Sequence, residues 1–480
     1  MGQEMLLHNL LIMSPEIALI VAACLNLLFG IFCRNSEEFA AKLTSIIVLC
    51  LVYLIFKYPY IICSEAFDGS YINNKYTSIF KMFILGGVFA ILVSYIGYFE
   101  VLKKKLDSEY VALILFSVAG SFVAISARDL IVLFVGLELQ SLPSYILAAY
   151  ARDNEKSSEA GLKYFILGAL SSAILLFGAS LLYGSSGSVN YAAISDVINK
   201  SHNIVAIVGV SMIMASMMFK LSIAPFHMWT PDVYEGAPII SVTIFASIHK
   251  IASLGIFVTL LSSLIGKFGA EFIPVLKIFA VLSLIIGAFG GIFQTSIKRL
   301  MGYSAILNAG YVMLAIIVDL KIGIWHHAFF TYMIIYSVAV IGFFISIAAA
   351  FGSKADDLSI EDLYGLGKTK KAAAASMTIM VFSMLGIPPL AGFFGKYYVI
   401  YDLISISEYK IAVLALTASI IAAYYYLRIV KSIYFHDPLL PSVKLPPTIN
   451  VICVISVCTI FILSFVSMAG YFAKLGAILN

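Results

Sequence analysis

The sequence predicts an all-α polytopic membrane protein with about fourteen transmembrane helices. Three observations lead to this fold class. Hydrophobic residues make up 62% of the 480 positions and charged residues only 12%, about half the charge of an ordinary soluble chain. Apolar runs of about 20 residues, the length that crosses a bilayer core, recur from end to end. The polar stretches between them are short, so we expect most of the outer surface to face lipid.

Charge and motif content argue against several classes of function. The net charge is only +4, and no basic run interleaved with aromatic residues indicates a nucleic-acid groove. The six cysteines form no Cys-x-x-Cys pair, and the seven histidines form no His-Glu-x-x-His motif. The chain also lacks a nucleotide loop and a flavin fingerprint. We therefore expect no nucleic-acid partner, no metal site and no cofactor in this chain.

The predicted spans follow one another along a single integral membrane domain, residues 1–480. The opening apolar run has no basic leader and no clear cleavage site, so we expect it to be retained rather than removed as a signal peptide. No linker or low-complexity tract divides the chain. The spans are expected at about residues 10–32, 43–63, 78–99, 110–127, 129–150, 164–184, 203–225, 238–263, 272–293, 300–319, 323–351, 372–404, 410–434 and 448–472.

The distribution of Lys and Arg predicts the orientation of these spans. Of the 30 basic residues, 17 fall at the loops that follow odd-numbered spans and 8 fall on the opposite side. Short cytoplasmic loops collect Lys and Arg. Both termini are therefore expected on the non-cytoplasmic side of the membrane.

Two segments break the pattern of simple spans. Residues 203–235 and 372–403 are each more than 30 residues long, or about 48 Å as a straight helix, against a hydrocarbon core of about 30 Å. Pro225 lies within the first segment, and Pro388 and Pro389 lie within the second, so both helices should be interrupted. Each break read alone is also consistent with a simple proline kink. Paired broken helices, however, are typical of an ion path through a transporter.

Four of the ionisable residues inside predicted spans are candidates for a function: Glu138, Lys220, Lys250 and Lys396. A charge near the bilayer centre costs about 2.5–3.5 kcal/mol on insertion scales, so it usually faces a partner or water inside the protein. We expect Lys220 to be the partner of Glu138, Lys250 to lie mid-span, and Lys396 to follow the second break. The four residues are candidates for a proton relay. The alternative is a static buried salt bridge that fixes helix register.

Three other polar residues have a simpler interpretation. Lys81 is within a turn or two of a span end, where its long stem can reach the headgroups. His249 precedes Lys250 but points about 100° away around the helix, so we expect it to be a packing residue. Glu16 follows Pro15 near the start of the first span and is expected at the interface or the helix start.

Several runs then carry a resemblance to a known family. The most specific is APFHMWTPDVYEGAP at residues 224–238. The others are LELQSLP at 137–143, QTSIKRLMGYS at 294–304, GIPPLAGFFGKYY at 386–398 and YYYLR at 424–428. Together they span about residues 130–430. They resemble the signature of the antiporter-like proton-channel subunits of respiratory complex I, the bacterial proton-pumping NADH-quinone oxidoreductase.

The resemblance implies two inverted five-helix repeats, each with a discontinuous helix. It divides the chain at about residues 1–109 for three N-terminal helices, 110–264 and 265–435 for the repeats, and 436–480 for a C-terminal helix. It also implies an ion pair between Glu138 and Lys220, a link from Lys250 toward the second repeat, and an exit-side site at Lys396. One position departs from the family, which commonly has His where this chain has Asn308. An amide does not titrate, so a relay there needs water or a hydroxyl.

The implied function is proton translocation across the bacterial inner membrane through the Glu and Lys relay, coupled to redox chemistry in other subunits. The implied partners are the other membrane and peripheral subunits and the lipid bilayer, with quinone reached only through the complex. A subunit of a multisubunit sodium/proton antiporter and a stand-alone solute symporter remain alternatives. A further alternative is a structural subunit whose buried charges only fix packing.

Overall fold

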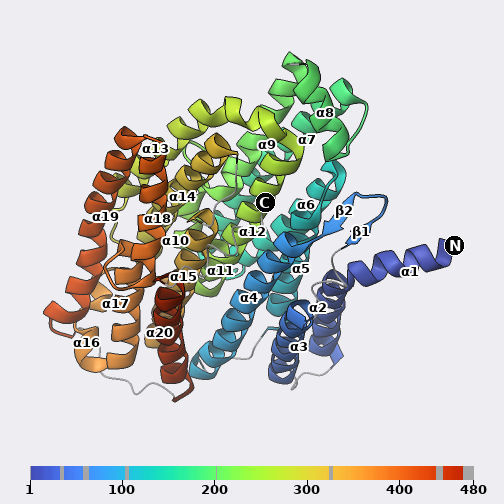
Figure 1. Ribbon diagram of the computed structural model, residues 1–480. Helices are drawn as coiled ribbons and strands as arrows, with labels where there is room; N and C mark the ends of the chain where they lie inside the picture. Colours follow the sequence, from blue (N-terminus) through green and yellow to red (C-terminus); the bar gives the residue numbers. More distant parts are fainter. Residues whose placement is uncertain are drawn as a thin grey trace.

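The computed structural model describes residues 2–32, 37–57, 64–102, 107–201, 203–323, 328–438 and 447–468, which form a helical bundle (Figure 1). Within these residues, 11 helices are long and apolar enough to cross a membrane. Three shorter apolar helices, at Lys42–Ile55, Lys371–Leu385 and Cys453–Ser467, occupy the remaining predicted spans. The predicted all-α polytopic fold is therefore confirmed.

The N-terminal part contains four helices and a small hairpin that the sequence did not predict. Its elements are α1 (Gly2–Ile12), α2 (Ser14–Phe32), α3 (Glu37–Lys57), β1 (Ser64–Ala66), β2 (Tyr71–Asn73) and α4 (Lys75–Leu102). The strands are antiparallel, with Ser64 opposite Asn73. Helix α1 extends away from the bundle (Figure 1). The first predicted span therefore corresponds to α2 alone.

The middle of the chain forms eight helices: α5 (Ser108–Ser126), α6 (Leu130–Ala148), α7 (Glu155–Ser186), α8 (Tyr191–Ser201), α9 (Ile204–Leu221), α10 (Trp229–Gly236), α11 (Ile239–Ala246) and α12 (Ile248–Thr259). Side-chain caps fix several of these helix starts. The Asp129 carboxylate accepts hydrogen bonds from the backbone amides of Ile131 and Val132 at the start of α6. The Asn203 side chain caps α9 in the same way. Such caps satisfy amides that have no partner within the helix.

A π-helical turn, Leu260–Ile265, and a 3₁₀ turn, Gly266–Phe272, lead from α12 into the last part of the chain. Its helices are α13 (Ile273–Gly290), α14 (Ile297–Ile322), α15 (Ala328–Phe351), α16 (Leu366–Thr369), α17 (Lys371–Leu385), α18 (Ala391–Ser405), α19 (Tyr409–Phe435) and α20 (Pro447–Met468). Two short 3₁₀ turns, Gly352–Asp356 and Glu361–Leu363, lie between α15 and α16.

Close approach of backbones holds two helix pairs together. A Cβ atom on Gly120 of α5 would lie 2.3 Å from the Gln140 amide nitrogen of α6. A Cβ atom on Gly287 of α13 would lie 2.4 Å from the Leu307 amide nitrogen of α14. Small residues let membrane helices pack at this distance. A larger side chain at either glycine would force the pair apart.

Both predicted interruptions are present. Helix α9 ends at Leu221, Ser222 adopts a left-handed conformation, and α10 begins at Trp229. Helix α17 ends at Leu385, Gly386 is left-handed, and α18 begins at Ala391. A third break, at Ser247 between α11 and α12, was not predicted because neither proline nor glycine marks it.

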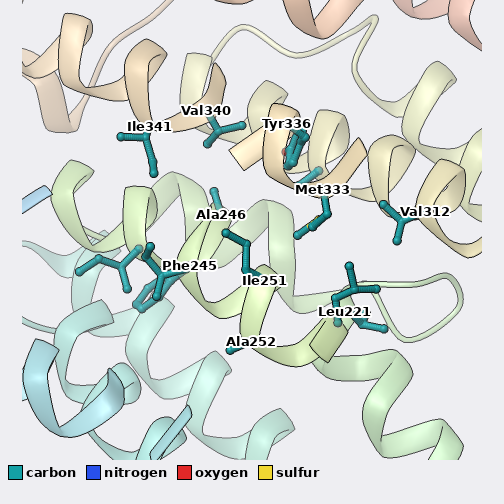
Figure 2. Packing of buried hydrophobic residues seen from close by; sticks show 14 of the residues in the cluster. Leu221, Phe245, Ala246, Ile251, Ala252, Val312, Met333, Tyr336, Val340 and Ile341 are labelled. Carbon is teal, nitrogen blue, oxygen red and sulfur yellow. The ribbon is translucent and has the colours of Figure 1, made fainter. Parts of the chain in front are cut away.

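The centre of the bundle is formed by α11 and α12, whose residues are all buried. They pack against α4, α5 and α15. Figure 2 shows part of this core, with Phe245, Ala246, Ile251 and Ala252 on α11 and α12 and with Val340 and Ile341 on α15, which packs against both helices. The outer helices α7, α13 and α19 instead expose many apolar side chains, as expected of a surface in contact with lipid.

Candidate functional site

Lys220 and Glu138 lie on neighbouring helices and are each bonded to a serine. Lys220, in the last turn of α9, donates from Nζ to the Ser141 hydroxyl of α6. Glu138, one turn before Ser141, accepts a hydrogen bond from the Ser172 hydroxyl of α7. The direct ion pair that the sequence predicts is not formed between these two described residues. In the structure, a serine hydroxyl is the hydrogen-bond partner of each group in place of the opposite charge.

Lys250 binds the end of the first broken helix. Its side chain on α12 is only 3% exposed. Its Nζ donates to the Leu221 carbonyl at 2.8 Å and to the Ser222 hydroxyl, both at the end of α9. The ammonium also lies 5.5 Å from the Trp229 ring centroid of α10. A helix C-terminus carries partial negative charge, so the break creates a site for this cation.

Lys396 makes the same kind of contact at the second broken helix. Its Nζ on α18 donates to the Leu385 carbonyl, at the end of α17, at 2.9 Å. It also donates to the Ser419 hydroxyl of α19 at 2.8 Å and lies 5.3 Å from the Tyr311 ring centroid of α14. Each break thus presents a backbone carbonyl to one buried lysine. That lysine also donates to a serine hydroxyl, Ser222 at the first break and Ser419 of α19 at the second.

Asn308 of α14 is buried in a polar cluster. Its Oδ1 accepts a hydrogen bond from the Tyr332 hydroxyl at 2.6 Å. Its Nδ2 donates to the Ser304 carbonyl at 2.6 Å, and the Ser304 and Tyr426 hydroxyls are 2.5 Å apart. The position that departs from the family therefore has hydroxyl groups beside it, as a relay around an amide would need.

Residues 127–422 match the family described as NADH:quinone oxidoreductase/Mrp antiporter, transmembrane. The chain belongs to this family. The match covers all four candidate residues and both broken helices.

Two curated relatives extend the similarity to most of the chain. NADH-quinone oxidoreductase subunit N of Rickettsia bellii (strain RML369-C) is 40% identical over 435 residues, which cover 90% of this chain and 94% of that protein. Subunit N of Rickettsia prowazekii (strain Madrid E) is 39% identical over 439 residues, which cover 91% of this chain and 94% of that protein. The similarity therefore includes helices on both sides of the family match.

Solved structures share the fold. A chain of respiratory complex I from Thermus thermophilus with bound aureothin is 26% identical, with a TM-score of 0.77 over 94% of this chain and 97% of that chain. A chain of the Mrp complex from Dietzia sp. DQ12-45-1b is 18% identical, with a TM-score of 0.80 over 97% of each chain, which shows the fold alone. The antiporter-like fold implied by the sequence motifs is confirmed.

The family motif at residues 224–238 supplies a charged cluster as well as the first break. Asp232 and Glu235 of α10 both accept hydrogen bonds from the Arg299 guanidinium of α14, at 2.7 and 2.8 Å. Asp232 also binds Lys163 of α7 at 2.7 Å. These partly exposed pairs join α10 to two neighbouring helices and thereby fix the segment that follows Lys220.

A buried ion pair outside the candidate site was missed in the sequence. Lys81 of α4 contacts Glu16 of α2 at 2.6 Å, and both side chains are almost fully buried. The Tyr71 hydroxyl of β2 donates to the same Glu16 oxygen at 2.5 Å. The prediction that Lys81 reaches the headgroups is therefore wrong, because its charge is neutralised inside the protein. Glu16 lies in the first turn of α2, as the helix-start interpretation expected, but its carboxylate is buried in this pair. An acid and a base, each within a predicted span, were the available signal.

His249 combines packing with a polar contact. Its ring stacks on Phe245 at a centroid distance of 5.5 Å, in agreement with the predicted packing role. Its Nε2 also lies 2.6 Å from the Ser117 hydroxyl of α5. The position of His249 around its helix thus predicted its packing role. It did not predict the hydrogen-bond partner, because that partner lies on another helix.

Proposed function

We propose that this chain is the antiporter-like membrane subunit N of an NADH-quinone oxidoreductase and that it moves protons across the membrane. The observation that carries the proposal is the 40% identity to subunit N of Rickettsia bellii over 90% of the chain. Glu138, Lys220, Lys250 and Lys396 form the proposed relay. Redox chemistry takes place in other subunits, because the scattered cysteines and histidines of this chain offer no ligand motif for a redox centre.

The mechanism is electrostatic. Glu138 and Lys220 bond to separate serines, so their ion pair is open in this structure, and its closing and opening is the proposed switch. Two unit charges 4 Å apart interact by about 4 kcal/mol at an effective dielectric of 20, which equals about a thousandfold change in proton binding. Closing or opening the pair therefore changes the proton affinity of Lys250 and then of Lys396.

The proposed division of the chain places in each repeat one broken helix and one lysine that binds the carbonyl at its end. Residues 110–264 contain α9 and Lys250, and residues 265–435 contain α17 and Lys396. Residues 1–109 and 436–480 add helices outside the repeats. The support is the shared contact of each lysine with the carbonyl that ends a broken helix.

The proposed setting is the bacterial inner membrane, with both termini on the non-cytoplasmic side. The partners are the other membrane and peripheral subunits of the complex and the lipid bilayer, and quinone is reached only through the complex. The alternative is a sodium/proton antiporter subunit of the Mrp type. It is less well supported, because the Mrp chain is 18% identical whereas curated subunit N relatives are about 40% identical.

The test uses membranes that contain the assembled complex. The tagged chain should copurify with flavin-containing and iron–sulfur-containing subunits. Glu138→Gln and Lys220→Ala should each lower NADH-driven proton pumping per assembled complex by about tenfold or more, since each removes a group that exchanges or controls the proton. Glu138→Asp, which keeps the carboxylate, is the matched control and should retain most pumping. Normal pumping by both neutralised variants would leave the pair with a packing role only.

A further inference from the structure

Two small cavities lie on either side of Asn308 and Tyr336. The first, of about 20 Å³, is next to Lys250. The second, of about 10 Å³, is next to Lys396. Asn308 and Tyr336 line both cavities, so these two residues stand between the lysines of the two broken helices.

The walls of the two cavities differ. Apart from Lys250, Asn308 and Tyr336, apolar side chains line the first cavity, among them Leu221, Val312 and Met333 (Figure 2). Tyr332, Ser383 and Lys396 also line the second. A buried water needs about 10–15 Å³ and two to four polar partners. The second cavity supplies those partners, and Lys250, Asn308 and Tyr336 supply them in the first, whose remaining wall is apolar.

Asn308 is not able to carry a proton between the two cavities. Its amide does not titrate at any relevant pH. Its Oδ1 is already bonded to the Tyr332 hydroxyl, and its Nδ2 to the Ser304 carbonyl. Asn308 therefore acts as a fixed anchor for the surrounding hydroxyl groups.

The Tyr336 hydroxyl is available instead. It is buried, and it makes no hydrogen bond of normal geometry within the described chain, although the Ser304 side chain is close enough for a weaker polar contact. Leaving a buried hydroxyl unpaired costs about 1–3 kcal/mol. A water in either cavity would relieve that cost, which makes this hydroxyl the natural bonding partner of water on both sides.

We propose that the Tyr336 hydroxyl passes protons between Lys250 and Lys396, with water in the two cavities as its partner. The inference rests on the proposed relay and names the group that replaces the titrating residue at Asn308. The ammonium of Lys250 releases a proton to water in the first cavity and becomes an amine. The Tyr336 oxygen accepts a proton from that water as its own proton leaves to water in the second cavity. The amine of Lys396 takes up that proton, and tyrosine and both waters are regenerated.

The experiment compares Tyr336→Phe with Tyr191→Phe in membranes containing the assembled complex. Tyr191 is the matched control, because its hydroxyl is also buried and unpaired within the described chain and it lines neither cavity. Tyr336→Phe should lower NADH-driven proton pumping by about tenfold or more. NADH oxidation with an artificial acceptor and the amount of complex should be unchanged. Tyr191→Phe should pump normally.

A rescue variant separates proton transfer from packing. Adding Asn308→His to Tyr336→Phe supplies a titrating group at the adjacent position and should restore part of the pumping, which a purely structural defect would not allow. Normal pumping by Tyr336→Phe while Lys396→Arg is impaired would overturn the role of Tyr336 and leave the relay intact. Normal pumping by both would overturn the relay as well.

Discussion

At the scale of single residues, the buried lysines fall into two kinds. Lys81 contacts the carboxylate of Glu16 at 2.6 Å, so its charge is neutralised directly. Within the described chain, Lys250 and Lys396 each donate hydrogen bonds to one backbone carbonyl and one serine hydroxyl. Removing one partner of a buried ion pair costs about 3–5 kcal/mol, so the first kind is suited to stabilising the fold. The second kind changes charge without leaving a buried carboxylate unpaired, which suits a proton carrier.

Lys396→Arg separates conduction from stabilisation at the second break. Guanidinium keeps the positive charge and the hydrogen-bond donors, but it does not deprotonate in proteins. We therefore expect assembly of the complex to be retained while NADH-driven pumping falls by about tenfold or more. Complex abundance and proton translocation are measured on the same membranes.

Lys396→Ala is the companion variant to Lys396→Arg. It should also lose pumping, and the amount of complex then shows how much the lysine contributes to the fold. If arginine pumps as well as lysine, Lys396 only stabilises the break.

At the scale of helices, proline content identified the breaks but not their chemistry. Pro225 and the Pro388–Pro389 pair correctly placed two interruptions. The residue that binds each freed carbonyl depends on tertiary contact, since Lys250 comes from a later helix and Lys396 from the helix just after the break. Spacing from lysine to proline along the chain therefore did not reveal the common arrangement. The break at Ser247 left no signal in the sequence at all.

Helix ends are also joined by ion pairs, and one of them has a defined pH dependence. Glu408, just before α19, contacts Lys277 of α13 at 2.5 Å and Lys321 of α14 at 2.9 Å. Hydrogen bonds from Lys277 and then Lys321 hold the pKa of the Glu408 carboxyl below its usual range. The resulting stabilisation is complete above the unfolded pKa of about 4.3 and is lost as the pH falls through the lower folded pKa.

Glu408→Gln should therefore lower the free energy of unfolding by about 1 kcal/mol at neutral pH, a modest value because the pair is partly exposed to solvent. The difference from the natural chain should disappear in acid, below the folded pKa. Thermal unfolding of the purified complex in detergent, followed across pH, measures the effect. A difference that is constant from neutral to acidic pH would show that the charge of Glu408 is not involved.

At the scale of the whole molecule, the sequence predicted the fold class and the family more completely than the contacts of the site. Apolar runs of membrane length gave all fourteen spans, because lipid requires every backbone group to be satisfied within a helix. The short hairpin at Ser64–Asn73 and the helices α1 and α8 were missed, since they are too short or too polar to read as spans. Glu138, Lys220, Lys250 and Lys396 were identified as ionisable groups in apolar runs, but their serine and carbonyl partners required the packed structure.

The orientation of the bundle in the membrane is predicted by its basic loops. The two loops on either side of the second broken helix pair should face opposite sides of the membrane. Lys368, in the basic loop before α17, is exposed and pairs with Asp437. Ser407, between α18 and α19, is exposed beside the Glu408 cluster. Since Lys and Arg collect in cytoplasmic loops, the side carrying Lys368 should be cytoplasmic and the side carrying Ser407 should not.

Single-cysteine labelling measures this orientation directly. With a membrane-impermeant thiol reagent, Lys368→Cys should react in inverted vesicles and be protected in intact spheroplasts, while Ser407→Cys should show the reverse. The unsubstituted chain is the control, because its described exposed cysteines, Cys24, Cys50 and Cys458, lie on apolar helices where lipid should shield them from the reagent. Tags at the two termini should be accessible from the same side of the membrane as Ser407. The opposite labelling pattern would invert the predicted topology.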